Sequence, residues 1–182
     1  MEGFEVGLEA LRRLPDALRA GSFGVTVTTV DRRVVRVEPG NSADRLFGMA
    51  FDIGTTTLVG TLVDLSSGRD LAVASMVNPQ TSFGDDVVSR IKACRDASDG
   101  LKRLHEAIID AVNRLIGEAA RKASVHPEEL CRLVFAGNTT MQEILCGISP
   151  VALGELPFVP AFREAPRIKA GDLKAVMGCY LD

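Results

Sequence analysis

The sequence predicts an α/β domain preceded by a small α+β segment. Three observations support this prediction: strand-like runs separated by polar turns begin near residue 46, helical periodicities follow them, and a polar stretch divides them from the first 45 residues. Of the 182 residues, 46% are hydrophobic and 25% are charged, which is enough apolar side chain for a packed core. We therefore expect a linker segment at residues 1–45 and a larger unit at residues 46–182.

The linker segment is predicted to form one helix and one β-hairpin. Leucines at three- and four-residue steps across residues 4–20 form an amphipathic stripe and predict a helix. Pro15 should kink or restart this helix, and the glycine that follows residue 20 should end it. Two β-branched runs, at residues 24–30 and 34–37, flank a short polar turn and indicate the hairpin. Turn formers crowd residues 38–44, so we place the domain boundary just after them.

Beyond the linker segment we expect three antiparallel strands followed by alternating helix and strand. The expected elements are strands at 48–53, 57–63 and 71–77, helices at 85–95 and 101–123, a strand at 130–135 and a short helix after Gly137. Asp99 stands where a cap of the long helix is expected. Prolines then interrupt the sequence and periodicity fades, so no element is predicted from Val151 to Asp182.

Charge and hydropathy exclude two classes of partner. Lysine and arginine total 21 against 24 acidic residues, so the chain lacks the positive excess that binds nucleic acid through counterion release. No apolar run approaches the roughly 18 residues that a membrane-spanning helix needs. The first residues carry neither the basic nor the apolar region of a signal peptide, and we expect a cytoplasmic protein with no membrane partner.

The cysteines and histidines predict no metal site. The cysteines form no C-x-x-C pair, unlike a disulfide framework, a zinc site or an iron–sulfur loop. We interpret all four as buried thiols: Cys94, Cys131, Cys146 and Cys179. His105 lies beside the apolar face of the long helix and should be packed there, whereas His126 precedes a proline and should be exposed. Neither histidine is expected to be catalytic.

The sharpest chemical signal lies where the first strand of the larger unit ends. Asp52 looks like a buried carboxylate in an apolar strand, and a buried carboxylate must be paired, hydrogen-bonded or coordinated to a metal. Gly54 would let backbone amides approach an anion, and Thr55, Thr56 and Thr57 would add hydroxyl donors to phosphate oxygens. Asp52 would then lie beside Mg²⁺ or orient a water. The same residues also suit an ordinary hairpin turn, and their spacing leaves both interpretations open.

A second polar turn joins the last predicted strand to the short helix. Its residues are Gly137, Asn138, Thr139 and Thr140. Free amides at a helix start would receive the γ-phosphate side of a nucleotide, and Asn138 would equally serve as a helix cap. Asp85 and Asp86 would assist Mg²⁺ or water, but simple capping of a helix start is the favoured interpretation. Gln80 would orient a water or form part of a turn.

The segment at residues 52–57 resembles the first phosphate motif of the superfamily that contains actin, sugar kinases and the Hsp70 ATPases. That superfamily has a ribonuclease H-like fold, whose subdomains begin with three antiparallel strands before helix and strand alternate. A more specific resemblance covers nearly the whole chain and is to the reductive activators of corrinoid-dependent enzymes. Four segments in this order carry it: Asn78–Gln80, Phe83–Ile91, Ala136–Met141 and Leu156–Pro160.

The resemblance implies an ATP-dependent reductive activator. Such proteins carry an N-terminal ferredoxin-like [2Fe-2S] domain and a C-terminal actin-like ATPase domain, and use ATP to drive reduction of a Co(II) corrinoid to Co(I). The implied ligands are ATP and Mg²⁺, with Asp52 acting through Mg²⁺ or a bound water. The implied partner is a corrinoid protein or a corrinoid-dependent methyltransferase. This chain has no ferredoxin cysteine loop, and its residues 5–45 resemble the linker that precedes the ATPase-like domain.

The resemblance also implies that the nucleotide site is incomplete. In this superfamily the nucleotide lies between two subdomains, and the second phosphate motif and the adenosine motif are expected beyond Asp182. Residues 46–182 would then be the first subdomain, incomplete at its C-terminus, with a tail at 169–182 that departs from the family pattern. We expect a phosphate-1 half site that hydrolyses ATP weakly or not at all by itself. Two alternatives stay open, a small-molecule kinase of the same superfamily and a non-catalytic docking module for a corrinoid or methyltransferase partner.

Overall fold

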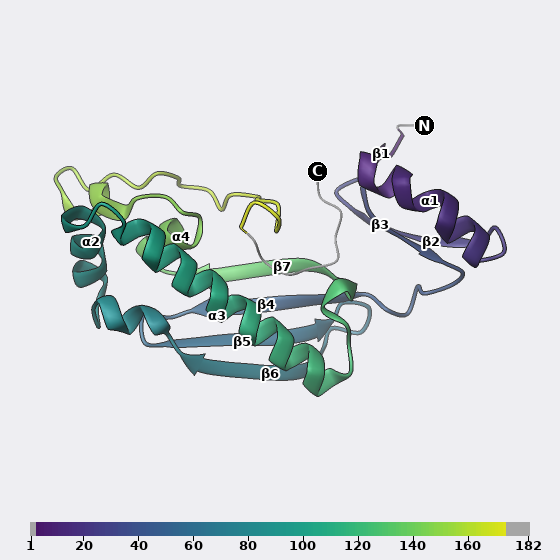
Figure 1. The fold of residues 1–182 in the computed structure, drawn as a ribbon, viewed down its shortest axis with the longest axis horizontal. Coiled ribbons are helices and arrows are strands. Elements are labelled where there is room, and N and C mark those ends of the chain that lie inside the picture. The colour runs from purple at the N-terminus through teal and green to yellow at the C-terminus, as the bar shows by residue number, and fades with distance from the viewer. Residues whose placement is uncertain (1–2, 174–182) are drawn as a thin grey trace.

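The computed structural model describes residues 3–173, which form two β-sheets with helices packed on them (Figure 1). The first sheet and its helix contain β1 (Glu5–Val6), α1 (Leu8–Ala20), β2 (Val25–Val30) and β3 (Arg33–Pro39). β3 lies between its neighbours, parallel to β1 and antiparallel to β2. Ala10 and Ala17 of α1 pack against Val34 and Val37 of β3 and form a small core.

The hairpin of the first sheet is as predicted, whereas the start of its helix is not. Asp31 and Arg32 form the turn between β2 and β3 with φ values of 49° and 70°. The predicted helix start at Phe4 is wrong, because the next two residues pair with β3 as a short strand. The helix begins at Leu8 and continues through Pro15 as one element.

The larger sheet follows the predicted order of elements. Its strands are β4 (Phe47–Ile53), β5 (Thr57–Asp64), β6 (Arg69–Val77) and β7 (Leu130–Gly137). The spatial order is β6-β5-β4-β7, with the first three strands antiparallel and β7 parallel to β4. The connecting and following elements are η1 (Pro79–Phe83), α2 (Val87–Asp96), α3 (Gly100–Ala123), η2 (Pro127–Glu129), α4 (Thr139–Leu145) and η3 (Pro150–Gly154). The expected fold class, an α/β unit with three antiparallel strands before alternating helix and strand, after a small α+β segment, is confirmed.

The starts of α2 and α3 show how far the sequence predicts helix caps. α2 begins at Val87 rather than at Asp85, because Asp86 is its cap and accepts a hydrogen bond from the Ser89 N–H at 2.7 Å. Asp99 is the N-cap residue of α3 as predicted, although its side chain makes no capping hydrogen bond. Capping depends on side-chain direction as well as position, and position is all that the sequence pattern supplies.

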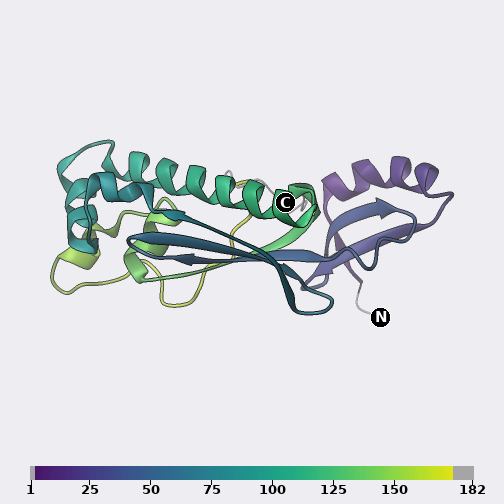
Figure 2. The same cartoon turned by 90° about the horizontal axis from the view of Figure 1, so that it is seen from below.

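α3 covers one face of the larger sheet and builds the main core (Figure 2). Leu104, Ile108 and Leu115 of α3 are at most 1% exposed, as are Leu58 and Leu62 of β5. Complete burial of an aliphatic side chain stabilises a fold by about 1.5–3 kcal/mol. The seam between α3 and the sheet therefore holds the larger unit together.

The opposite face of this sheet is covered by no helix of residues 3–173 (Figure 2). β4 shows the difference between the faces, because Phe51 and Ile53 are buried while Asp52 between them is exposed. Val73 of β6 and Val134 of β7 are 49% and 53% exposed on the same open face. Alternate side chains of a strand point to opposite faces, so the path of α3 decides which of them are buried.

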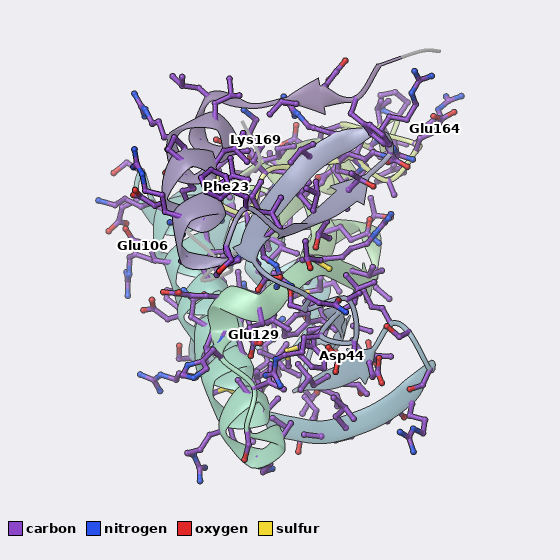
Figure 3. The ribbon with its side chains drawn as sticks, turned by 90° about the vertical axis from the view of Figure 1, so that its right-hand side faces the viewer. Phe23, Asp44, Glu106, Glu129, Glu164 and Lys169 are labelled. Carbon is purple, nitrogen blue, oxygen red and sulfur yellow. The ribbon has the colours of Figure 1, made fainter. Side chains whose placement is uncertain are left out.

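Three residues join the two sheets. Arg36 of β3 is 4% exposed and donates to the backbone carbonyls of Glu129 at 2.7 Å and Arg45 at 2.9 Å. Arg45 in turn donates to both carboxylate oxygens of Glu129, with Nη2 at 2.7 Å from Oε2. Figure 3 looks onto this end of the molecule and labels Glu129. The first sheet is thus attached to the start of β7 through charged hydrogen bonds.

Candidate functional site

The two polar turns predicted as phosphate contacts lie at the same edge of the larger sheet. β4 and β7 are parallel neighbours with Ile53 opposite Gly137, and each turn follows the carboxyl end of its strand. The backbones approach closely, because a Cβ added to Gly137 would lie 3.0 Å from the carbonyl oxygen of Ile53. The fold therefore brings residues 54–57 and 137–140 together from distant parts of the sequence.

The turn at residues 54–57 is tight. Gly54 donates its N–H to the Thr57 carbonyl at 3.1 Å, and a Cβ on Gly54 would lie 2.5 Å from that same oxygen. Thr55 is half-buried, while Thr56 and Thr57 are exposed. Glycine at position 54 thus lets the chain reverse within two residues and brings the threonines to the surface.

The carbonyl groups of this turn are held from its inner side. Asn78 donates from Nδ2 to the Gly54 carbonyl and from its backbone N–H to the Thr56 carbonyl, both at 2.8 Å. Arg90 donates from Nη2 to the Thr55 carbonyl. A trans peptide points its N–H away from its C=O, so the amides of Thr55 and Thr56 face outward. Within residues 3–173 neither amide donates to a protein group, which leaves both available to an anion.

Asp52 is not buried, and the expectation of burial is wrong. The residue lies on the open face of the sheet, between Val59 of β5 and Ala136 of β7. The apolar neighbours in the sequence suggested an interior strand, but only their side chains face α3. In the described part of the chain Asp52 forms no ion pair. Its carboxylate is therefore open to a metal ion or water.

Asn138 acts as the cap of α4. Its Oδ1 accepts a hydrogen bond from the Met141 N–H at 3.0 Å, as the capping interpretation predicts. Thr140 is 4% exposed, whereas Asn138 and Thr139 reach the surface. Gln142 donates to the Gly137 carbonyl at 2.7 Å, which fixes the end of β7. A phosphate contact from this turn stays a prediction.

Three fully buried polar residues lie behind the first turn, and sequence reasoning missed the role of Arg90. Asn78, Gln80 and Arg90 are all 0% exposed. Gln80 donates to the Leu104 carbonyl of α3 at 2.9 Å and accepts from Arg90 Nη1 at 3.3 Å, so it is a structural residue of the turn region rather than one that orients a water. In the sequence, Arg90 lies within the Phe83–Ile91 segment and next to the apolar Ile91, which is also buried, but neither feature indicated its hydrogen-bond partners.

The contacts of the other polar candidates, Asp86 and the two histidines, agree with the structural interpretations of these residues. The hydroxyl and amide of Ser89 bond to Asp86 and lower the pKa of that carboxyl, which supports the capping interpretation. His105 is packed as predicted, with Nδ1 at 3.0 Å from the Ile144 carbonyl oxygen, and His126 is exposed.

The cysteines are partly as predicted. Cys131 is buried, while Cys94 and Cys146 are half-buried, and burial raises the pKa of both of these thiols. Cys179 lies outside the described residues. Among residues 3–173 no three His, Cys, Asp or Glu side chains gather as a metal site. No helix in that range is both long and apolar enough to cross a lipid bilayer.

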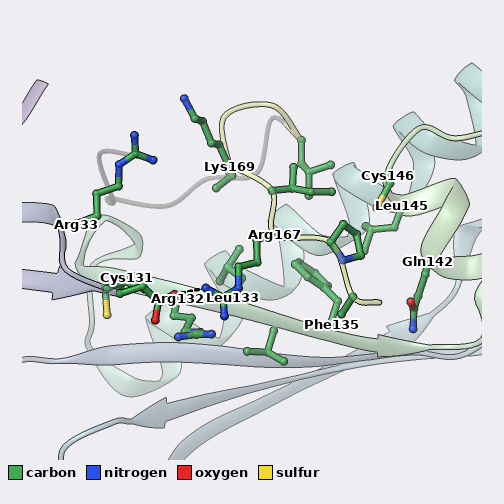
Figure 4. A pocket seen from close by; sticks show the side chains of 18 of the residues that line it. Arg33, Cys131, Arg132, Leu133, Phe135, Gln142, Leu145, Cys146, Arg167 and Lys169 are labelled. Atoms are coloured by element: carbon green, nitrogen blue, oxygen red, sulfur yellow. Dashed lines mark hydrogen bonds and ion pairs between the residues drawn. The ribbon is translucent and has the colours of Figure 1, made fainter. Parts of the chain in front are cut away.

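A cavity of about 720 Å³ follows the outer edge of β7 (Figure 4). Its basic lining residues are Arg33, Arg132, Arg167 and Lys169. Neither residues 52–57 nor residues 137–140 line it. The cavity is therefore separate from the two polar turns.

Comparison with known proteins places the chain in a family. Residues 1–44 match the RACo linker region and residues 47–178 match the RACo middle region. The chain is 36% identical over 141 residues to the corrinoid activation enzyme RamQ of Eubacterium limosum, and this match covers 77% of this chain and 24% of RamQ. It is also similar to the solved structure of a reductive activator for corrinoid, iron–sulfur protein, with 36% identity and a TM-score of 0.85 over 96% of this chain and 28% of that one.

The chain thus spans a minor part of the length of either relative. The matched regions cover almost the whole sequence, and the fold agrees closely with that of the solved relative. On this basis the chain belongs to the RACo family and contains the family's linker and middle regions.

Proposed function

We propose that this chain supplies the phosphate-binding half of an ATP site in a reductive activator that returns a Co(II) corrinoid to Co(I). Relatives named for corrinoid activation and for reductive activation of a corrinoid, iron–sulfur protein support the class of reaction. The partner is a corrinoid protein or a corrinoid-dependent methyltransferase. The reduction belongs to the whole protein, and the nucleotide contact is this chain's share of it.

The observation that carries the proposal is the outward-facing backbone of the turn at 54–57. The free amides of Thr55 and Thr56 and the adjacent hydroxyls form a set of donors suited to phosphate oxygens. Hydrogen bonds from such donors to an ionised phosphate are about twice as strong as those between neutral groups. An ordinary hairpin turn needs no buried side chains to hold its carbonyls, whereas Asn78 and Arg90 hold those of this turn.

Asp52 fits a role in holding Mg²⁺ or a metal-bound water. Its carboxylate is exposed and stands two residues before Gly54, at the end of β4. Mg²⁺ prefers oxygen ligands and keeps most of its waters, so a single accessible carboxylate beside the phosphates suits it. When bound, Mg²⁺ neutralises charge on the β and γ phosphates.

The second turn completes the contact on the γ-phosphate side. Its contributors are Gly137, Asn138, Thr139 and Thr140, with backbone amides and the exposed Thr139 hydroxyl as the donors. These two turns approach the phosphates from one side only. Preorganised donors on all sides and exclusion of water are needed for phosphoryl transfer, so we expect weak or absent ATP hydrolysis by the chain alone. Measurable turnover would contradict a half site.

Calorimetric titration of Mg-ATP into the chain tests the nucleotide contact. We expect the wild-type chain to bind and Asp52→Asn to bind at least about tenfold more weakly, because a charged contact is lost. Asp70→Asn is the matched control, since Asp70 is an exposed carboxylate of β6 at the far end of the same sheet, opposite Val63. No binding by the wild type, or equal binding by all three proteins, contradicts the proposal.

Activity is tested in a full-length family member. Replacing the aspartate equivalent to Asp52 by alanine should abolish ATP-dependent corrinoid reduction while capture of the corrinoid partner persists. Undiminished reduction would contradict the proposed role. If the corrinoid partner is captured without nucleotide and without this aspartate, and reduction is unchanged, the result favours the docking module. Phosphate transfer to a small molecule favours the kinase.

A further inference from the structure

Arg90 is a fully buried guanidinium whose hydrogen-bond partners are all uncharged. Nη2 donates to the Thr55 carbonyl, Nε to the Gly84 carbonyl at 3.2 Å, and Nη1 to Gln80 Oε1 at 3.3 Å and Met141 Sδ at 3.0 Å. No carboxylate within residues 3–173 forms an ion pair with it. The positive charge therefore lies in the core without a direct ion pair, although the carboxylates of Asp85 and Asp86 act on it electrostatically.

Packing alone does not explain a charge at this position. Burying an ion without a counter-ion is strongly unfavourable, and a methionine would fill similar space without that cost. Burial lowers the pKa of Arg90 and the carboxylates of Asp85 and Asp86 raise it, but a guanidinium stays protonated in either case. A cation is thus maintained in direct contact with the turn.

The contacts of Arg90 connect both polar turns. Thr55 belongs to the first turn, and Met141 follows the second turn on α4. The Thr55 carbonyl and the Thr56 N–H belong to one planar peptide, so the bond from Arg90 fixes the direction of that amide. Gln80 extends the network, because its own N–H donates to Asn78 Oδ1 at 2.9 Å.

We infer that Arg90 is a positioning residue of the phosphate turn, which holds the Thr56 amide outward and places a buried positive charge behind the bound polyphosphate. This inference rests on the proposed function of the turn. The phosphate would bring further negative charge near the buried cation, and the backbone of the turn separates the two. Arg90 consequently acts through the turn without touching the nucleotide.

Three variants of the chain test the inference by Mg-ATP calorimetry. Arg90→Met should weaken binding by about 10- to 100-fold, and Arg90→Lys should weaken it less because the charge remains. Ile91→Ala is the matched control, since Ile91 is the next residue of α2, is 8% exposed and makes no hydrogen bond to the turn. Urea unfolding measures how much each variant destabilises the fold. The inference is overturned if Ile91→Ala weakens binding as much as Arg90→Met, or if Arg90→Met binds like the wild type.

Amide hydrogen exchange without nucleotide separates this inference from the proposed function. The N–H groups of Gly54 and Asn78 donate to carbonyls of the turn, so in Arg90→Met they should exchange about tenfold faster relative to the core amides of β4. Unchanged exchange overturns the positioning role whether or not ATP binds. Faster exchange in a chain whose wild type binds no Mg-ATP supports the positioning role and refutes the nucleotide site. If Arg90→Met does not fold, Arg90→Lys provides the same comparison.

Discussion

At position 54 the surrounding backbone leaves room for no side chain larger than that of glycine. The hydrogen bond that closes the turn brings the Thr57 carbonyl oxygen to 2.5 Å from the position that a Cβ would occupy. Backbone on the opposite side of a turn cannot move aside as a flexible side chain can. A larger residue must therefore open the turn and disturb the amides of Thr55 and Thr56.

Replacing Gly54 by alanine should lower the free energy of unfolding by about 1–3 kcal/mol, the usual cost of forcing an atom into a filled space. Mg-ATP binding should be lost along with the closed turn. Urea unfolding and calorimetry measure the two effects. Gly117→Ala is the control, because an added Cβ on α3 would meet nothing within 4 Å beyond the adjacent backbone of its own helix, and alanine there should stabilise by up to about 1 kcal/mol. Full ATP affinity in Gly54→Ala would show that the closed turn is not needed for binding.

At the scale of elements, α3 decides the character of the larger sheet. It buries one face, and on the other face β4 keeps Asp52 exposed. The Leu104 carbonyl of the same helix accepts a hydrogen bond from the Gln80 side chain. This bond links the seam between α3 and the sheet to the hydrogen-bond network behind the turn. Core stability and the shape of the turn are thus connected through one element.

Truncation of the seam between α3 and the sheet should be costly. Ile108 is 0% exposed, so Ile108→Ala should lower the free energy of unfolding by about 2–5 kcal/mol through lost burial and the cavity that remains. Val88→Ala on α2 is the comparison, because Val88 is 73% exposed and a surface truncation changes stability by about 0.5 kcal/mol or less. Both values come from urea unfolding. Similar losses for the two variants would mean that α3 does not form the seam described.

At the scale of the whole molecule, charged hydrogen bonds attach the small sheet to the large one. Arg36 reaches across from β3 to the Glu129 carbonyl, and Arg45 pairs with the Glu129 carboxylate. The Arg45 hydrogen bond is the main reason that the pKa of Glu129 lies below its ordinary value of 4.5. The folded protein therefore binds a proton at Glu129 less readily than the unfolded chain.

This attachment should weaken in acid. Because folding lowers the pKa of Glu129, its contribution is complete above the ordinary pKa and is lost as the pH falls through the lowered value. Glu129→Gln should destabilise the protein by about 0.5–1 kcal/mol at pH 7, the range for a partly exposed ion pair, and by less at about pH 3, which lies below the ordinary pKa of the carboxyl. Urea unfolding at both pH values checks this, with Glu128→Gln, an exposed neighbour, as control. An equal loss at both pH values would assign the effect to packing instead of charge.

The order of elements follows from the sequence because its signals are local. Strand alternation, helical periodicity and turn residues predicted β4 to β6, the long helix and β7 within a few residues. Four short segments between Asn78 and Pro160 indicated the family. β1 was missed because two residues form a strand only through pairing with β3. Its existence depends on a neighbour that is distant in the sequence.

The sequence by itself determined which residues form the candidate site and which elements carry them. Only the tertiary structure decided that Asp52 is exposed, that both polar turns share one sheet edge, and that Arg90 lies behind the Thr55 carbonyl. Periodicity and turn chemistry are properties of contiguous residues, so a sequence displays them. Burial and hydrogen-bond partners are properties of pairs brought together by the fold, since the path of α3 selects the covered face and the packing of α2 selects the partners of Arg90.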